Sequence, residues 1–106
     1  MMKLLLKLSR AIDWLTERTG LGPGGTVVDV GAGTGKLSRL LVATGARVVA
    51  VEPLAEMRAL IEGVEAVDAT AEELPFADGV ADVVTVAQAL HWFDLSRALP
   101  EMHRVL

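Results

Sequence analysis

The sequence predicts a single α/β domain built on a parallel β-sheet. Three observations indicate this class: short runs rich in valine and alanine, amphipathic helical patterns between those runs, and glycine-rich turns at the junctions. Of the 106 residues, 52% are hydrophobic and 23% are charged, which is a globular composition. We therefore expect one domain over residues 1–106, with helices on both faces of a sheet of about four strands.

Charge and cysteine content argue against several classes of function. Ten Lys and Arg against 14 Asp and Glu give a net charge of −4, and no basic block is present. This disfavours a nucleic-acid partner. Without cysteine the chain offers no disulfide and no thiolate ligand, and we expect no metal site. A cysteine-free chain fits a reducing compartment, and no apolar run approaches the length of a membrane span. We expect a cytoplasmic protein with no membrane partner.

The first predicted element is a helix over residues 2–19. Leucine and isoleucine recur there at helical spacing, and Gly20 follows at the position that commonly ends a helix. Its charges are of mixed sign, which favours a helix that covers the core over one that lies on a membrane surface.

The stretch from residue 27 to residue 36 carries the main functional signal. A β-branched run leads into Gly31, Gly33 and Gly35, and a helix is predicted over residues 36–44. A strand, a tight turn and a helix N-terminus together make a site for the polar part of a nucleotide-like ligand. Glycine serves this turn because it has no Cβ and lets the backbone approach a ligand closely.

The spacing of these glycines distinguishes between nucleotide-binding motifs. A dinucleotide fingerprint needs a glycine at position 36, where this chain has Lys36. A P-loop needs Ser or Thr after Gly-Lys, and Leu37 stands there instead. The pattern that fits is V-x-D-x-G-x-G-x-G, with Asp29 two residues before the first glycine. A nicotinamide-dependent oxidoreductase is disfavoured by this frame.

This pattern resembles motif I of the class I S-adenosylmethionine-dependent methyltransferases, whose fold is Rossmann-like. In that family the loop holds the methionine and ribose parts of S-adenosyl-L-methionine, and the acidic residue faces the positively charged side of the ligand. The resemblance therefore implies that Asp29 and the loop bind this cofactor. The loop residues are Gly31, Ala32, Gly33, Thr34 and Gly35.

A second strand is predicted over residues 47–51 and ends at Glu52. A carboxylate about 20 residues after the first glycine can accept two hydrogen bonds from the vicinal hydroxyl groups of a ribose. Glu52 also matches the family's acidic residue at the end of the second strand. We therefore expect Glu52 to bind the cofactor ribose.

A short helix is expected next, with Pro53 at its first position and Gly63 after its end. The apolar residues at helical spacing, expected to form its packed face, are Leu54, Met57, Leu60 and Ile61. The resemblance places Pro53 and Met57 beside the cofactor, because relatives often use a residue here against the adenine. For Met57 itself a position in the core is expected from its spacing, and the adenine contact is what the resemblance adds.

A third strand is predicted over residues 64–68, at an edge of the sheet. The segment 69–76, Ala-Thr-Ala-Glu-Glu-Leu-Pro-Phe, resembles the family segment that ends in E-x-L-P-F. There a side chain and a backbone N–H bind the adenine, which implies roles for Thr70 and for the backbone of Ala71. Many relatives carry Asp where this chain has Thr70. Leu74 and Phe76 are expected to close the end of the core.

A fourth strand is predicted over residues 81–87, beside the first. Ligands of open α/β sheets bind at the carboxyl ends of the strands, which places Gln88 near the methionine end of the cofactor. The run Gln-Ala-Leu-His-Trp-Phe-Asp resembles a signature of small-molecule methyltransferases of the type 11 kind. His91 could be a general base for an acceptor hydroxyl, since its ordinary pKa is near neutral, or a structural hydrogen-bonding group.

The last predicted element is a helix capped by Asp94, with a kink or a late start caused by Pro100. His103 and Arg104 are expected to face solvent. The residues expected on its packed face are Leu95, Leu99, Met102 and Leu106.

The resemblance covers residues 26–106 and implies the strand order 3-2-1-4. The family sheet normally has seven strands, so a truncated domain is expected, and its exposed fourth strand could pair with a second copy in a homodimer. The function implied is methyl transfer from S-adenosyl-L-methionine to a small-molecule acceptor. The alternative is a non-catalytic remnant that binds S-adenosylmethionine or S-adenosylhomocysteine and lacks the acceptor-side strands.

Overall fold

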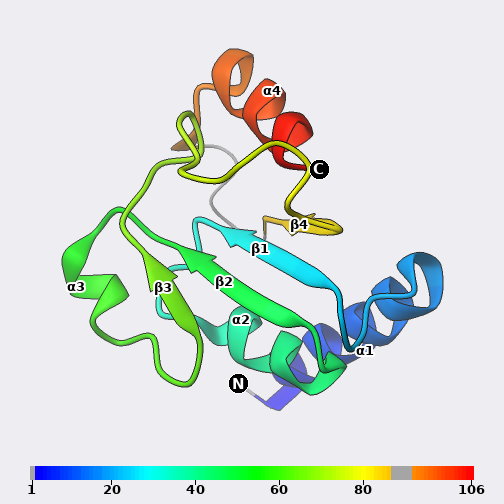
Figure 1. The fold of residues 1–106 in the computed structure, drawn as a ribbon. Helices are drawn as coiled ribbons and strands as arrows, with labels where there is room; N and C mark the ends of the chain where they lie inside the picture. The colour runs from blue at the N-terminus through cyan, green and yellow to red at the C-terminus, as the bar shows by residue number, and fades with distance from the viewer. Residues whose placement is uncertain (1, 87–91) are drawn as a thin grey trace.

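The fold is a parallel sheet with helices on both faces, as the sequence predicts (Figure 1). A computed structural model describes residues 2–86 and 92–106, with side chains from residue 10 onward. In this part of the chain the sheet has four strands in the order β3-β2-β1-β4, all neighbours being parallel. The strands are β1 (Thr26–Val30), β2 (Arg47–Val51), β3 (Glu65–Val67) and β4 (Val83–Thr85). The predicted order and the edge positions of β3 and β4 are confirmed.

The helices lie in two layers. Helices α1 and α2 cover one face of the sheet, and α4 lies on the opposite side (Figure 1). Helix α2 ends in a 3₁₀ turn, η1, which tightens the last part of the predicted helix before Gly45. The bounds are α1 (Met2–Thr19), α2 (Lys36–Leu41), η1 (Val42–Thr44), α3 (Ala55–Arg58) and α4 (Leu95–Val105). None of the described helices is long and apolar enough to cross a membrane.

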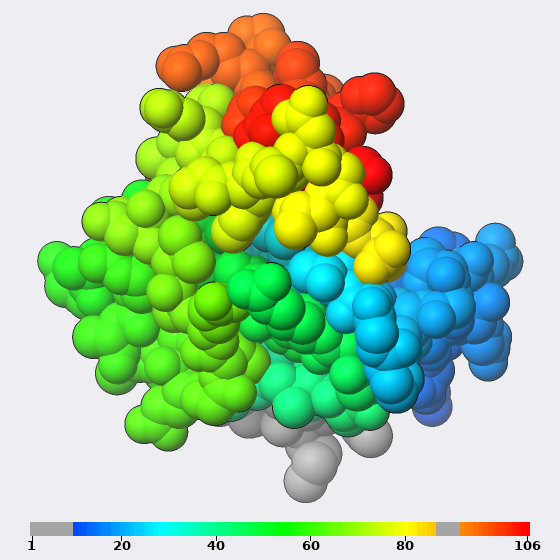
Figure 2. All heavy atoms as spheres, in the orientation of Figure 1, coloured from blue at the N-terminus to red at the C-terminus, as the bar shows by residue number. Residues whose placement is uncertain are grey.

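Alternation along the strands divides the core into two clusters, because successive strand side chains point to opposite faces. Toward α1 and α2 the buried cluster contains Ile12, Leu21, Val27, Leu41, Val48 and Val83. Toward α4 it contains Val28, Val30, Val51, Ala71, Leu74, Ala81, Ala98, Met102 and Val105. A sheet covered on both faces explains why β1 and β2 are almost continuously apolar in sequence. Figure 2 shows the segment that leads into β4, in yellow, between β1 and α4.

The prediction for α3 is wrong in length and in its packed face. The helix has only four residues, begins after Leu54, and leaves Pro53 outside it. Leu54 and Leu60 are 56% and 60% exposed, and Met57 is exposed as well, so the expected position of Met57 in the core is also wrong. A polar contact anchors this segment instead, because the Arg58 guanidinium donates to the main-chain carbonyls of Glu52 and Pro53.

The cap of α4 is confirmed, but its packed face is not the one predicted. Asp94 accepts a hydrogen bond from the Ser96 amide at 3.1 Å, and the helix starts at Leu95 with Pro100 inside it, so a late start is excluded. Three of the four residues expected on the packed face, Leu95, Leu99 and Leu106, are exposed. The buried stripe is Ala98, Met102 and Val105. The small side chain of Ala98 presents a flatter helix face to the sheet than the leucines would.

Arg104 does not face solvent as predicted. Its guanidinium donates to the carbonyls of Leu74 and Phe76 and pairs with Asp78 at 2.8 Å and with Glu101 at 2.7 Å. Glu101 in turn accepts from the Leu74 amide, and these hydrogen bonds, chiefly that of Arg104, lower the pKa of Glu101 to about 2. The pair ties the segment before β4 to α4. Leu74 is buried and Phe76 packs against the same cluster, which confirms that they close the end of the core.

Candidate functional site

Those predicted cofactor residues that the structure describes lie at the carboxyl edge of the sheet. The loop of residues 31–35 follows β1, Glu52 follows β2, and residues 69–71 follow β3 shortly after its end. The carboxyl ends of parallel strands meet at one edge, and the Glu52 amide donates to the Val67 carbonyl at 3.0 Å, which holds the ends of β2 and β3 together. Segments far apart in the sequence therefore form one candidate site (Figure 1).

The glycine loop has a backbone shape that side chains would strain. Gly31, Gly33 and Gly35 have φ values of 66°, 61° and 84°, in the left-handed region that favours glycine. The loop is fixed by hydrogen bonds from the Ala32 amide to the Val51 carbonyl and from the Gly35 amide to the Ala32 carbonyl, both 3.0 Å.

The surroundings of two loop glycines differ in a way that fits a bound ligand. A Cβ on Gly35 would lie 3.2 Å from two carbons of Ile61, so the Ile61 side chain leaves little room for a larger residue there. A Cβ on Gly33 would meet no heavy atom within 4 Å. The loop therefore presents open space at Gly33, and the residues of this edge fit the cofactor that the sequence implies.

Glu52 joins the loop to the segment after β2. Its side chain accepts the Gly33 amide on Oε1 at 2.8 Å and the Leu54 amide on Oε2 at 3.0 Å, and the residue is 7% exposed. An ionised carboxylate has about four acceptor sites, so two remain for the hydroxyl groups of a ribose. The sequence indicated the ribose role but gave no sign of these loop contacts.

Asp29 is held in the layer between β1 and α2. It is 1% exposed, and its carboxylate accepts the Ser38 hydroxyl at 2.6 Å and the Thr85 hydroxyl at 2.9 Å. Burial raises the pKa of Asp29, while both hydrogen bonds oppose that rise. Its predicted contact with the positive side of the cofactor stays a prediction. Sequence reasoning missed Ser38 and Thr85, although the register that pairs Thr85 with Asp29 follows once β4 is placed beside β1.

A second residue that the sequence analysis missed supports the loop. The Arg39 guanidinium reaches back from α2 and donates to the Thr34 carbonyl at 2.9 Å. A side chain of helix α2 thus binds the turn that precedes the helix. The sequence signal for such a contact is a basic residue in the first turns after a glycine loop. Thr34 is thus held through its backbone, while its predicted cofactor contact is untested.

The side expected to receive the adenine is formed by a short turn and by exposed residues after β2. The Glu73 amide donates to the Thr70 carbonyl at 3.2 Å, Thr70 is exposed and Ala71 is buried. Pro53 and Met57 lie exposed in the segment that follows Glu52. These four positions remain candidate contacts. Gln88 and His91 lie outside the described residues, and their predicted roles stay predictions.

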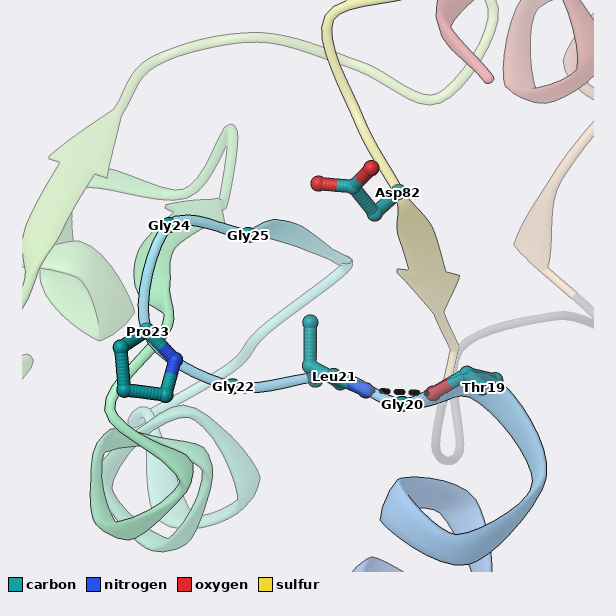
Figure 3. Close-up of a pocket in the computed structure, with 8 residues that line it drawn as sticks. All are labelled: Thr19, Gly20, Leu21, Gly22, Pro23, Gly24, Gly25 and Asp82. Atoms are coloured by element: carbon teal, nitrogen blue, oxygen red, sulfur yellow. Dashed lines mark hydrogen bonds between the residues drawn. The ribbon is translucent and has the colours of Figure 1, made fainter.

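A pocket of about 260 Å³ lies at the opposite end of the strands, where β1 and β4 begin. Figure 3 shows the Asp82 carboxylate facing the glycine-rich turn before β1. Asp82 accepts the Thr26 amide at 2.8 Å, which identifies it as a structural contact between the two strand starts. The lining residues are Thr19, Gly20, Leu21, Gly22, Pro23, Gly24, Gly25 and Asp82. None of these residues was predicted to bind the cofactor.

Comparisons with known proteins agree with this geometry. A methyltransferase domain family model matches residues 28–106. An uncharacterized methyltransferase of Mycobacterium tuberculosis is 49% identical over 100 residues, which are 91% of this chain and 40% of the relative. The ubiquinone/menaquinone biosynthesis C-methyltransferase of Rubrivivax gelatinosus is 38% identical over 89 residues, covering 78% of this chain and 36% of the relative.

Solved structures extend the agreement to three dimensions. A protein of Anaeromyxobacter dehalogenans assigned as a type II methyltransferase superposes with a TM-score of 0.80 at 34% identity, over 92% of this chain and 42% of the other. The chain thus spans about 40% of the length of the curated relatives it matches. The family match covers the glycine loop, Glu52 and the turn at Ala71 together. The chain therefore belongs to the class I S-adenosylmethionine-dependent methyltransferases.

Proposed function

We propose that this chain binds S-adenosyl-L-methionine at the carboxyl edge of its sheet and directs methyl transfer to a small-molecule acceptor. The observation that carries the proposal is the joining of the Gly33 amide to the Glu52 carboxylate at 2.8 Å. This contact joins Glu52, the acid proposed to bind the ribose, to the glycine loop at Gly33, where a Cβ would meet no heavy atom within 4 Å.

The residues of this edge have separate tasks. Glu52 accepts the ribose hydroxyl groups, the loop of residues 31–35 lies along the ligand, and Thr70 with the Ala71 backbone contacts the adenine. The cofactor, when bound, supplies an activated methyl group on a sulfonium centre. Orientation in a site that excludes water can account for a large part of the rate of such a transfer, and no base is obligatory. His91 is proposed as a base where the acceptor is a hydroxyl group, and Gln88 is proposed to contact the methionine end.

The small-molecule acceptor is supported by a named relative. The Rubrivivax gelatinosus protein, 38% identical over the matched region, is a C-methyltransferase of ubiquinone and menaquinone biosynthesis. The net charge of −4 also disfavours a polyanionic acceptor. A cytoplasmic location, expected from the absence of cysteine, belongs to the same proposal.

Formation of S-adenosylhomocysteine in the presence of an acceptor panel tests this function. We expect turnover with at least one quinol or phenol, and binding of S-adenosylhomocysteine without any acceptor. Saturable binding with no turnover across the panel would favour the alternative, a non-catalytic binding remnant. No binding by a folded protein would refute the proposal for this chain.

The predicted pairing of a second copy along β4 stays a prediction. Within the described sheet β4 is bonded to β1 on one side and forms an edge, and apolar edge strands favour association. Sedimentation at micromolar concentration should give the mass of a dimer. A monomer mass for the unaltered protein would contradict the pairing.

A further inference from the structure

The buried carboxylate of Asp29 connects three elements. Asp29 lies in β1 opposite Thr85 of β4, and Ser38 lies in α2. Each carboxylate oxygen accepts one hydroxyl group, Ser38 at 2.6 Å and Thr85 at 2.9 Å. Asp29 and Ser38 are 1% and 0% exposed, so these contacts form inside the protein. Strands β1 and β4 and helix α2 therefore meet at the Asp29 side chain.

The hydrogen bond between Ser38 and Asp29 joins the residues on either side of the glycine loop. Asp29 stands two residues before Gly31, and Ser38 stands three residues after Gly35. The hydrogen bond from Ser38 to Asp29 therefore closes a ring whose remaining part is the loop itself. Thr85 holds the same carboxylate from the neighbouring strand, which fixes its orientation. The cluster therefore joins the end of β1 to the first turn of α2.

Stability alone does not account for a carboxylate at this place. The same face of β1 packs Val27 beside Val48 and Val83, and an aliphatic side chain could continue that layer. Burying a carboxylate costs free energy even when it is hydrogen-bonded, and replacing a buried polar group together with its partners by apolar groups of the same shape is often neutral or stabilising. A directional contact offers what an aliphatic contact does not, because it defines where α2 begins relative to β1.

We propose that Ser38 and Thr85 are positioning residues for the cofactor loop. Their hydroxyl groups hold the Asp29 carboxylate, the carboxylate fixes α2 against β1, and residues 31–35 thereby keep the shape that the cofactor needs. The inference rests on the proposed function for the identity of the ligand, and it adds two residues that do not touch that ligand. The two hydroxyl groups act on one carboxylate, so the effects of removing them are not additive.

The test separates the hydroxyl group of Thr85 from its methyl group. Thr85→Val removes the hydroxyl and keeps the shape, whereas Thr85→Ser keeps the hydroxyl and removes the methyl. Ser38→Ala and the double variant with Thr85→Val complete a cycle. Two quantities are measured: the Kd for S-adenosylhomocysteine by calorimetry, and the amide exchange rates of the loop by NMR in the protein without ligand.

We expect Thr85→Val to accelerate exchange of the hydrogen-bonded Ala32, Gly33 and Gly35 amides by about tenfold relative to the amides of β1, as expected for loss of one buried hydrogen bond. The Kd should rise by a similar factor of about ten, and Thr85→Ser should keep both quantities within about twofold. In the double variant, the increase in Kd and in loop exchange rate should be smaller than the product of the two single increases.

Equal Kd values and equal loop exchange rates in Thr85→Val and Thr85→Ser would overturn the inference. Faster amide exchange spread evenly over the whole protein would overturn it as well. The Thr85 pair suffices for this decision if Ser38→Ala does not fold. Failure of the proposed function has a different signature, because the unaltered protein would then not bind S-adenosylhomocysteine while its loop exchange still responds to the loss of the hydroxyl. Unchanged loop exchange contradicts the positioning role whether or not the ligand binds.

Discussion

Replacing Glu52 by glutamine changes one oxygen into an amino group in a place where two main-chain donors converge. The Gly33 amide donates to one carboxylate oxygen at 2.8 Å and the Leu54 amide to the other at 3.0 Å. Glutamine offers a single acceptor oxygen and an NH₂ group that can only donate. Whichever way the side-chain amide is turned, one main-chain N–H faces another donor.

The magnitude follows from the burial of the site. An unsatisfied buried donor costs about 1–3 kcal/mol, and the carboxylate bonds that are lost are of the stronger, charge-assisted kind. Glu52 is 7% exposed, so water replaces little of this loss. The free energy of unfolding should fall by about 1–3 kcal/mol. The ribose contact weakens as well, and affinity for S-adenosylhomocysteine should fall by about 10- to 100-fold, since 1.4 kcal/mol corresponds to tenfold.

Calorimetric titration and urea unfolding measure the two effects in parallel. Glu56→Gln is the matched control, because it makes the same chemical change at an exposed position in α3, in the same region of the chain. This control should bind and unfold like the unaltered protein. Identical behaviour of Glu52→Gln and Glu56→Gln in both measurements would refute the role of Glu52 in holding the loop and the ribose.

Three further predictions follow from the same contacts. The pKa of Glu101 is lowered from 4.5 to about 2 in the folded protein, so its stabilising contribution is present above pH 4.5 and is lost as the pH falls toward 2. In urea unfolding across this range, Glu101→Gln should lose less of its free energy of unfolding than the unaltered protein does. An equal loss in the two proteins would contradict the contact. Gly33→Ala should cost about 1–2 kcal/mol through its positive φ alone, and Gly35→Ala clearly more because the added Cβ meets Ile61; equal costs by thermal unfolding would count against this packing. Met102→Ala should lower the free energy of unfolding by about 2–5 kcal/mol and Leu99→Ala by under about 1 kcal/mol, and a loss for Leu99→Ala as large as that for Met102→Ala would restore the packed face expected from sequence.

Elements with strong local signals could be predicted from the sequence. The valine-rich runs identified β1 and β2 because strands buried on both faces are apolar without interruption. The glycine spacing located the loop, since its positive φ values require that residue. Asp94 marked the start of α4 through its capping side chain. Each of these signals lies within a few residues of the structure it specifies.

Features set by contacts between distant segments could not be read in the same way. The hydrogen bond from Thr85 to Asp29 joins residues 56 positions apart, and that from Arg104 to Leu74 spans 30. Helix α4 carries two apolar stripes at helical spacing, and only the placement of the sheet decides that Ala98 rather than Leu99 is buried. Helix α3 is short, and its Arg58 donates to the Glu52 carbonyl at the end of β2, a contact that periodicity does not encode.

The most direct test of the central claim, that the cofactor binds at the carboxyl edge of the sheet, is an NMR titration of the isotope-labelled protein with S-adenosylhomocysteine. Saturable shifts are expected at the amides of residues 31–35, Leu54 and Ala71. The amides of residues 20–22, 24 and 25, which line the pocket at the opposite end of the strands, should stay unchanged. Shifts confined to residues 20–25, or none at millimolar ligand in a folded protein, would contradict the claim.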